Sequence, residues 1–305
     1  MSSQVTLSQT SGHGPALTAF NNALALAWTG YHNDYLNVAS STDGGQTWGS
    51  PTVISAQQTS NTPAIAALGG VFYYAWAGTD GYLNLMQSSD LKSFSGKVTF
   101  QEETKYGTGP ALVVFKDVLY VAWTTSIADQ TTDNNTLLLM LAKIVNGGLS
   151  DVVAVPGQQS SSSPALAADD NYIYLGWTGT NYTASDQVLG IGQSAVDPNL
   201  NIIRSSDGAT SSNHQVLSER TPVTVSPCLV GCQPALTVSG SKLILGWTGD
   251  DSNNSLNTMY STDQGLTFVG KQTDTSNSSH WGPALYSSYI AFTGTDNHLN
   301  IKQGV

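Results

Sequence analysis

The apolar positions of this chain fall in short runs, each followed by a polar turn or loop. The runs are rich in β-branched, aromatic and leucine residues, and they are too short for helices. Such runs are typical of β-strands, and consecutive apolar positions are typical of strands that are buried on both faces. Residues that tolerate a positive φ, such as Asn21-Asn22 and Gly69-Gly70, separate many neighbouring runs, as two-residue hairpins require. The pattern predicts an all-β protein.

The same succession of runs and turns occurs six times, and each copy opens on Pro-Ala followed by Leu or Ile. The copies begin at Pro15, Pro63, Pro110, Pro164, Pro234 and Pro283. Three of the intervals between them are 47 to 49 residues long, and the other two are 54 and 70 residues long. A repeated unit of about 50 residues is typical of one propeller blade. We therefore predict a single domain, residues 1–305, that folds as a six-bladed β-propeller.

Each unit predicts four antiparallel strands, which we name A to D in chain order. Strand A begins at the proline, strand B ends near Trp-Thr-Gly, and strand C often opens with Leu-Asn. Segments such as Pro51–Ser55 and Pro222–Ser226 are predicted as strand D. The last unit ends after its strand C, whereas Gln4–Ser8 precedes Pro15 as a strand D would. We therefore predict that the N-terminal strand completes the last blade, which closes the ring and removes an open sheet edge.

The longest interval marks an insertion, which we place between strands B and C of the fourth blade, near Asn181–Asn199. Cys228 and Cys232 lie close together in a segment with proline and glycine, so they predict either a disulfide or two thiols. Two cysteines are too few for a disulfide scaffold, and without neighbouring histidines they do not predict a metal site.

Composition narrows the range of partners, because only 10% of the residues are charged and the net charge is −11. Ten Lys and Arg residues give no basic surface that could neutralise phosphates, so neither nucleic acid nor an anionic membrane is an expected partner. No apolar run approaches the roughly 18 residues of a membrane span, and Met1–Thr10 lacks the layout of a signal peptide. We expect a soluble protein without membrane insertion. Its location stays open, and its surface composition is compatible with extracellular action.

Two segments between strands C and D carry a recognisable motif. Ser41–Trp48 reads Ser-Thr-Asp-Gly-Gly-Gln-Thr-Trp, and Ser261–Phe268 reads Ser-Thr-Asp-Gln-Gly-Leu-Thr-Phe. Both resemble the Asp-box (BNR) pattern, so the chain resembles the Asp-box family of sialidase-like six-bladed propellers. Ser88–Asp90 and Ser205–Gly208 look like eroded copies. In that family the motif lies on the face opposite the ligand site, so the resemblance implies a fold and not a reaction.

The resemblance does not extend to the catalytic groups of that family. Sialidases hold the substrate carboxylate with three arginines and use a Tyr nucleophile, a Glu and an Asp acid/base. This chain has two arginines, Arg204 and Arg220, both in the fourth unit and away from where the clamp would lie. It also lacks other nucleophile, metal-ligand and phosphate-loop motifs. We expect a non-catalytic member without cofactor or metal; a glycoside hydrolase using Glu102, Glu103 or Glu219 is the less favoured alternative.

An aromatic residue near the end of strand B recurs in every unit. The series is Trp28, Trp76, Trp123, Trp177, Trp247 and Phe292. We expect these side chains to fill the space between blades, because tryptophan buries a large area. The alternative is that their edges form the floor of ligand clefts beneath the B–C loops.

The B–C and D–A loops lie on one face of a propeller, which is the usual ligand face of this architecture. These loops combine Asp and Asn with aromatic residues, and hydroxyl-rich ligands require both hydrogen bonds and a stacking surface. The predicted ligand-binding residues are Tyr31, Asp34, Tyr35, Asp80, Tyr82, Tyr106, His280, Trp281, Asp296 and His298. For the Asp residues the structural alternative is a role in the turn itself. We expect His280 and Trp281 to form a pocket with the B–C loop of blade five or blade six.

The preferred hypothesis is a lectin-like propeller that binds glycans or glycoconjugates at several weak sites. A protein-recognition or architectural module would use the same scaffold, since a fold does not determine a function. Several small polar and aromatic pockets would favour a glycan ligand. One broad apolar or strongly charged patch would favour a protein partner.

Overall fold

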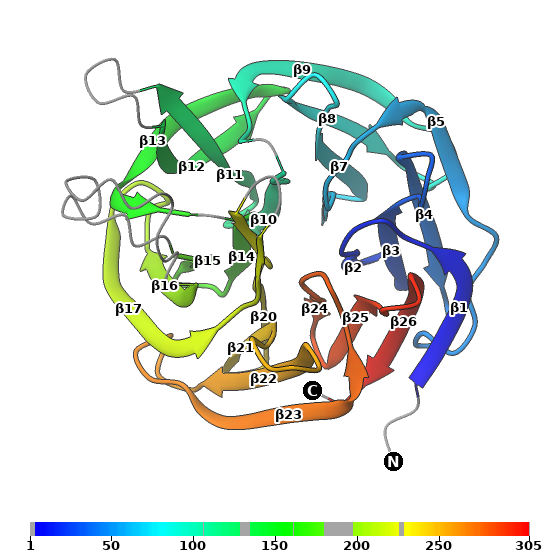
Figure 1. Ribbon diagram of the computed structural model, residues 1–305. Coiled ribbons are helices and arrows are strands. Elements are labelled where there is room, and N and C mark those ends of the chain that lie inside the picture. The colour runs from blue at the N-terminus through cyan, green and yellow to red at the C-terminus, as the bar shows by residue number, and fades with distance from the viewer. Residues whose placement is uncertain are drawn as a thin grey trace.

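A computed structural model describes residues 4–105, 107–128, 135–160, 162–179, 198–225 and 229–304. Within these ranges the strands form six four-stranded antiparallel sheets and one two-stranded hairpin, and there is no helix. The six sheets are arranged around a central axis as the blades of a β-propeller (Figure 1). The predicted fold class is confirmed. None of the described residues forms a helix that could cross a membrane.

The first three blades follow the predicted order of strands A to D. Blade 1 consists of β2 (Ala16–Phe20), β3 (Ala23–Thr29), β4 (Tyr35–Ser41) and β5 (Thr52–Gln58). Blade 2 consists of β6 (Ala64–Leu68), β7 (Val71–Ala77), β8 (Tyr82–Ser88) and β9 (Ser95–Glu103). Blade 3 consists of β10 (Ala111–Phe115), β11 (Val118–Ala128), β12 (Asn135–Val145) and β13 (Gly148–Gln159).

The remaining blades contain the two irregular connections and the ring closure. Blade 4 consists of β14 (Ala165–Ala168), β15 (Ile173–Thr178), β16 (Asn199–Ser205) and β17 (Ser211–Arg220). Blade 5 consists of β20 (Ala235–Ser239), β21 (Lys242–Thr248), β22 (Ser255–Ser261) and β23 (Val269–Ser278). Blade 6 consists of β24 (Ala284–Tyr286), β25 (Tyr289–Thr293), β26 (His298–Gln303) and β1 (Gln4–Thr10). The extra hairpin consists of β18 (Val223–Val225) and β19 (Leu229–Gly231).

The N-terminal strand closes the ring, as predicted. Strand β1 pairs with β26, and Thr6 lies opposite Asn300. The Thr6 hydroxyl donates a 2.6 Å hydrogen bond to the Asn300 side chain, and Leu7 is buried in the same blade. The first strand of the chain therefore supplies the outer strand of the last blade.

Strand D of blade 4 corrects one prediction. It is β17, which pairs directly with β16, so the assignment of Pro222–Ser226 to this strand was wrong. Residues Val223–Val225 pair instead with β19 in the segment that leads to blade 5. The prediction failed because it used the distance to the next proline, and here that distance includes an additional hairpin.

The insertion in blade 4 lies where it was predicted, because β15 and β16 are paired B and C strands and most of the inserted residues separate them. Residues 180–197 of this connection lie outside the described residues, as does Cys228. The thiol of Cys232 is buried and donates to the carbonyl of His280 at 3.2 Å.

Among the described residues, the buried apolar side chains form six clusters, one between each pair of neighbouring blades. Every cluster contains one aromatic residue of the strand B series, contributed by the second blade of the pair. These are Trp28, Trp76, Trp123, Trp177, Trp247 and Phe292, each at most 2% exposed. Their predicted role in filling the space between blades is confirmed.

In five blades a threonine follows this aromatic residue and joins the blade to the next one. Thr29, for example, is fully buried and donates a 2.6 Å hydrogen bond to the carbonyl of Asn61, which precedes strand A of blade 2. The equivalent pairs are Thr124 with Ser162, Thr178 with Cys232, Thr248 with Trp281 and Thr293 with His13, at 2.6 to 2.8 Å. We call these bonds the threonine latches. Blade 2 has Ala77 at this position and therefore no hydroxyl to donate.

The C–D turns stabilise the opposite face, which we call the turn face because it also carries the A–B hairpins. In blade 1, Asp43 accepts bonds from the Thr47 backbone at 2.9 Å and from its hydroxyl at 2.6 Å. These bonds lower the pKa of Asp43 to about 2. Asp263 makes the same two bonds to Thr267 in blade 5. Each of these carboxylates therefore stabilises its own turn through hydrogen bonds.

Removing one latch tests how strongly the blades depend on it. Thr29→Val keeps the shape of the side chain but leaves the buried Asn61 carbonyl without its donor. We expect the free energy of unfolding to fall by about 1–3 kcal/mol, measured by chemical denaturation. The matched control is Thr79→Val in an exposed loop, which should change stability by less than about 0.5 kcal/mol. An unchanged midpoint for Thr29→Val would show that the latch does not contribute to stability.

Candidate functional site

The B–C loops of four blades share one construction. An Asx side chain accepts a hydrogen bond from the backbone N–H two residues later, at 2.9 to 3.2 Å. The backbone N–H of Tyr35 donates to the Asn33 side chain, and in the same way Tyr82 donates to Asp80, Asn253 to Asp251 and His298 to Asp296. The turn role therefore accounts for one oxygen each of Asp80 and Asp296, and their role as ligand-binding residues stays a prediction.

The Leu-Asn sequence of strand C holds these loops in place. The carboxamides of Asn37, Asn84 and Asn300 each donate to the carbonyl of the loop residue two positions earlier, at 2.8 to 2.9 Å. The three acceptors belong to Tyr35, Tyr82 and His298, which are predicted site residues. The buried asparagines therefore fix the positions of half-buried side chains on the loop face, the face of the B–C and D–A loops.

In blade 1, the predicted residues Tyr31 and Asp34 differ in their exposure to solvent. Tyr31 is 39% exposed, and its ring centroid lies 3.8 Å from that of His32. Asp34 has a positive φ and is half-buried, and its backbone bonds to Gly30 and Thr59. Tyr31 is therefore the accessible aromatic surface of this loop.

Trp281 contacts the neighbouring blade 1. Its ring centroid lies 4.6 Å from that of His13, and the carbonyls of both residues accept threonine latches. Burial lowers the pKa of His13 to about 4, and the negative charge of Asp34 opposes this shift. His13, Trp281 and Asp34 thus come together at the boundary of blades 6 and 1.

His280 faces the other way. It is exposed, and its Nδ1 lies 3.3 Å from the Asn254 side chain in the B–C loop of blade 5. Of the two loops predicted to neighbour these residues, His280 therefore contacts the one from blade 5.

The other predicted residues belong to different blades. Asp80 and Tyr82 belong to blade 2, Asp296 and His298 to the B–C loop of blade 6, and Tyr106 lies outside the described residues. The predicted residues are distributed around the loop face and do not converge on one pocket.

A cavity of about 610 Å³ opens on the loop face between blades 4 and 5. The end of β17 forms one wall, with Ser218, Glu219 and Arg220. The B–C loop of blade 5, residues 249–255, and the side chains of Lys271, Thr273 and Thr275 from β23 form the others. This volume is within the range of small-ligand sites in proteins.

Trp247 forms part of the cavity floor although it belongs to the core. Lys271 lies over its ring, with the amine 5.4 Å from the ring centroid, and pairs with Glu219 across the blade boundary. Thr273 donates to Asn257 at 2.6 Å beside them. An aromatic edge is thus surrounded by hydroxyl, carboxamide, carboxylate and ammonium groups.

The sequence did not predict Arg220 or Lys271 as site residues, and it raised Glu219 only for the less favoured glycoside hydrolase. They lie on the outer strands of two blades, far from Trp247 in the sequence. One feature of the sequence pointed towards this cavity. The aromatic residues of strand B were expected, as an alternative to a core role, to form the floor of a cleft beneath the B–C loops. Trp247 lies at the floor of the cavity, but it is 1% exposed and mainly fills the core.

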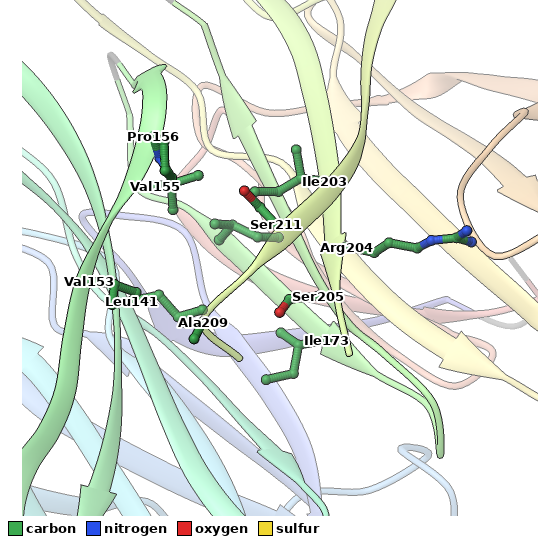
Figure 2. A pocket seen from close by; sticks show the side chains of 11 residues that line it. Leu141, Val153, Val155, Pro156, Ile173, Ile203, Arg204, Ser205, Ala209 and Ser211 are labelled. Atoms are coloured by element: carbon green, nitrogen blue, oxygen red, sulfur yellow. The ribbon is translucent and has the colours of Figure 1, made fainter. Parts of the chain in front are cut away.

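A second hollow, between blades 3 and 4, is different in size and chemistry. Figure 2 shows Val153 and Val155 facing Ile173 and Ile203, with Arg204 pointing away. Its volume is about 20 Å³, which is room for little more than one water molecule. We therefore do not treat it as a ligand site.

Comparison with known proteins adds the fold and little else. No protein-family model matches the chain, and no curated protein matches it in sequence. An unknown-function protein from Dyadobacter fermentans aligns with a TM-score of 0.66 and 15% identity, over 99% of this chain and 98% of that one. The Hadza microbial sialidase Hz136 aligns with a TM-score of 0.61 and 13% identity, over 96% of this chain and 65% of that one. This chain shares its fold with sialidases.

A second sialidase, a variant of NanB from Streptococcus pneumoniae, aligns with a TM-score of 0.61 and 9% identity. The alignment covers 98% of this chain and 70% of that one. The predicted likeness to sialidase propellers is confirmed at the level of the fold.

The burial of His13 beside Trp281 predicts that the stability of the fold depends on pH. His13 has a lowered pKa in the folded chain, so below pH 6.5 the unfolded chain binds a proton that the folded chain does not. The stabilisation is complete above pH 6.5 and is lost as the pH falls towards 4. We expect His13→Gln to lessen this loss by about 1–3 kcal/mol, measured by denaturation at several pH values. His32→Gln, at an exposed position, is the control and should follow the unmodified protein.

Proposed function

We propose that the protein is a non-catalytic, lectin-like propeller that binds glycans on its loop face. The observation that carries this proposal is the cavity between blades 4 and 5, where the edge of Trp247 is surrounded by polar side chains. The cavity has the volume of a small-ligand site, and its groups are those that recognise sugars.

A sugar ring presents hydroxyl groups at its edge and C–H groups on its faces. Carboxylates such as Asp250 accept hydrogen bonds from hydroxyls, and side chains such as Asn253 and Lys271 donate to them. An aromatic ring face would bind the C–H groups, but Trp247 is 1% exposed and lies beneath Lys271, so its contact with a sugar is small. The cavity therefore supplies hydrogen-bond donors and acceptors for the hydroxyl groups.

Further weak sites on other blades would raise the avidity for clustered glycans. Tyr31, Tyr82 and Trp281 each lie on the loop face of a different blade. Binding to several of these positions at once would multiply modest affinities, because the second contact becomes intramolecular. We therefore propose several sites, with the cavity as the principal one.

The arginines support a binding role over sialidase chemistry. Arg204 lies at the turn face, where it bonds to the Gln264 carbonyl and stacks on Tyr172. Arg220 lines the cavity on the loop face, so only one of the two arginines of this chain lies at a proposed site. The carboxylate-binding site of sialidases, described above, needs three arginines.

Filling the cavity tests the proposal directly. A glycan array should identify sugars with individual Kd values on the order of 10 µM to 1 mM. Ser218→Trp places a large side chain at an exposed position of the cavity wall, and we expect it to weaken binding at least about tenfold by steric exclusion. The matched control is Ser212→Trp, at an exposed position of the same strand outside the cavity.

Normal binding by Ser218→Trp would move the principal site away from this cavity. Trp281→Ala would then test the boundary of blades 6 and 1. If no glycan binds the unmodified protein, the proposal fails and protein recognition becomes the preferred function.

We expect no sialidase activity from the purified protein. The physical reason is that one arginine in the cavity cannot form the three-fold contact with a sialic acid carboxylate. The measurement is hydrolysis of a fluorogenic sialoside, with an active sialidase as the positive control. Turnover above the uncatalysed rate would overturn the non-catalytic assignment.

A further inference from the structure

We infer that the glycan bound between blades 4 and 5 is electrically neutral, and that sialylated or sulfated glycans are disfavoured. This inference rests on the proposed function and specifies the class of ligand. It reverses the expectation that the fold of sialidases alone would suggest.

The charges that line the cavity favour a neutral ligand. Glu219, Asp250 and Asp251 are acidic, and Arg220 and Lys271 are basic. Lys271 is already paired with Glu219, so its ammonium charge is balanced before any ligand arrives. An anionic sugar would enter a space where carboxylates outnumber the basic groups.

The acidic loop cannot move away easily to accommodate an anion. The Asp251 carboxylate accepts bonds from the Asn253 backbone at 2.9 Å and from the Ser255 hydroxyl at 3.1 Å. Asp250 is exposed on the same loop, next to this fixed carboxylate. The two adjacent charges are therefore held at the mouth of the cavity.

The distribution of charge over the whole molecule acts in the same direction. Acidic side chains lie on both faces, and those of the loop face include Asp34, Asp80, Glu103 and Asp296. Lys105, Arg220 and Lys271 lie on the loop face as well, whereas five basic residues lie on the turn face: Lys92, Lys116, Lys143, Arg204 and Lys242. Three of them bond there to Ser206, Asp151 and Gln264. With a net charge of −11, the molecule as a whole has a negative field, which lowers the local concentration of anionic ligands.

Neutral hydroxyls match the same groups well. A carboxylate accepts from a hydroxyl without needing a cation, and each hydroxyl can also accept from Lys271 or Asn253. The cavity can therefore bind a neutral sugar through charge-assisted hydrogen bonds, which are stronger than bonds between neutral groups.

The experiment compares matched pairs of glycans on one array: lactose with sialyllactose, and N-acetyllactosamine with its sulfated form. We expect the neutral member of a bound pair to bind at least about tenfold more tightly, and the difference to narrow as salt is raised. Asp250→Lys should raise the relative binding of the anionic members. Asp170→Lys, at an exposed position on the turn face, is the matched control and should leave the ratio unchanged.

Equal or tighter binding of sialyllactose would overturn the inference while supporting glycan binding as the function. A ratio that responds equally to Asp250→Lys and Asp170→Lys would also overturn it, because the charge near the cavity would then have no special effect. If no member of any pair binds, the proposed function itself fails.

Discussion

In five of the six blades, an aromatic residue followed by threonine at the end of strand B ties the blade to both of its neighbours. Successive residues of a strand point to opposite faces of the sheet, so the aromatic ring and the hydroxyl cannot serve the same interface. Trp247 packs against blade 4, and Thr248 donates to the carbonyl of Trp281 at the start of blade 6. The aromatic residue thus packs against the preceding blade, and the threonine forms a buried hydrogen bond to the following blade. Because Thr293 donates to His13, the last blade is linked to the first in the same way.

The latches also connect the core to the loop face. The carbonyls that accept them belong to residues just before strand A, and some of these residues carry the aromatic side chains of the loop face. Thr248 and Thr293 fix the backbones of Trp281 and His13, and this brings the two rings to 4.6 Å. The arrangement of side chains on the loop face is therefore set by bonds that lie in the interior.

The repeat made most of the fold predictable, because strands, hairpins and ring closure each follow from local patterns that recur. The assignment of Pro222–Ser226 to strand D failed where the repeat is irregular, since the prediction could not distinguish an outer strand from the added β18–β19 hairpin. The cavity was less predictable still. It joins Glu219 and Trp247 across a blade boundary, and the sequence shows neither the pairing of Lys271 with Glu219 nor that a core residue lines the cavity.

The cavity lies at the boundary next to the same irregularity. Three of the five intervals between repeats are 47 to 49 residues long, whereas the interval from Pro164 to Pro234 is the longest of the chain. Its extra residues lie between β15 and β16 and again after β17, and both positions are connections of the loop face at blade 4. Insertions in repeat proteins fall on loops of one face, which is often the binding face. In a ring of similar blades, the boundary next to blade 4 is therefore where a distinct ligand site can arise without disturbing the aromatic residues and latches that hold the other blades together.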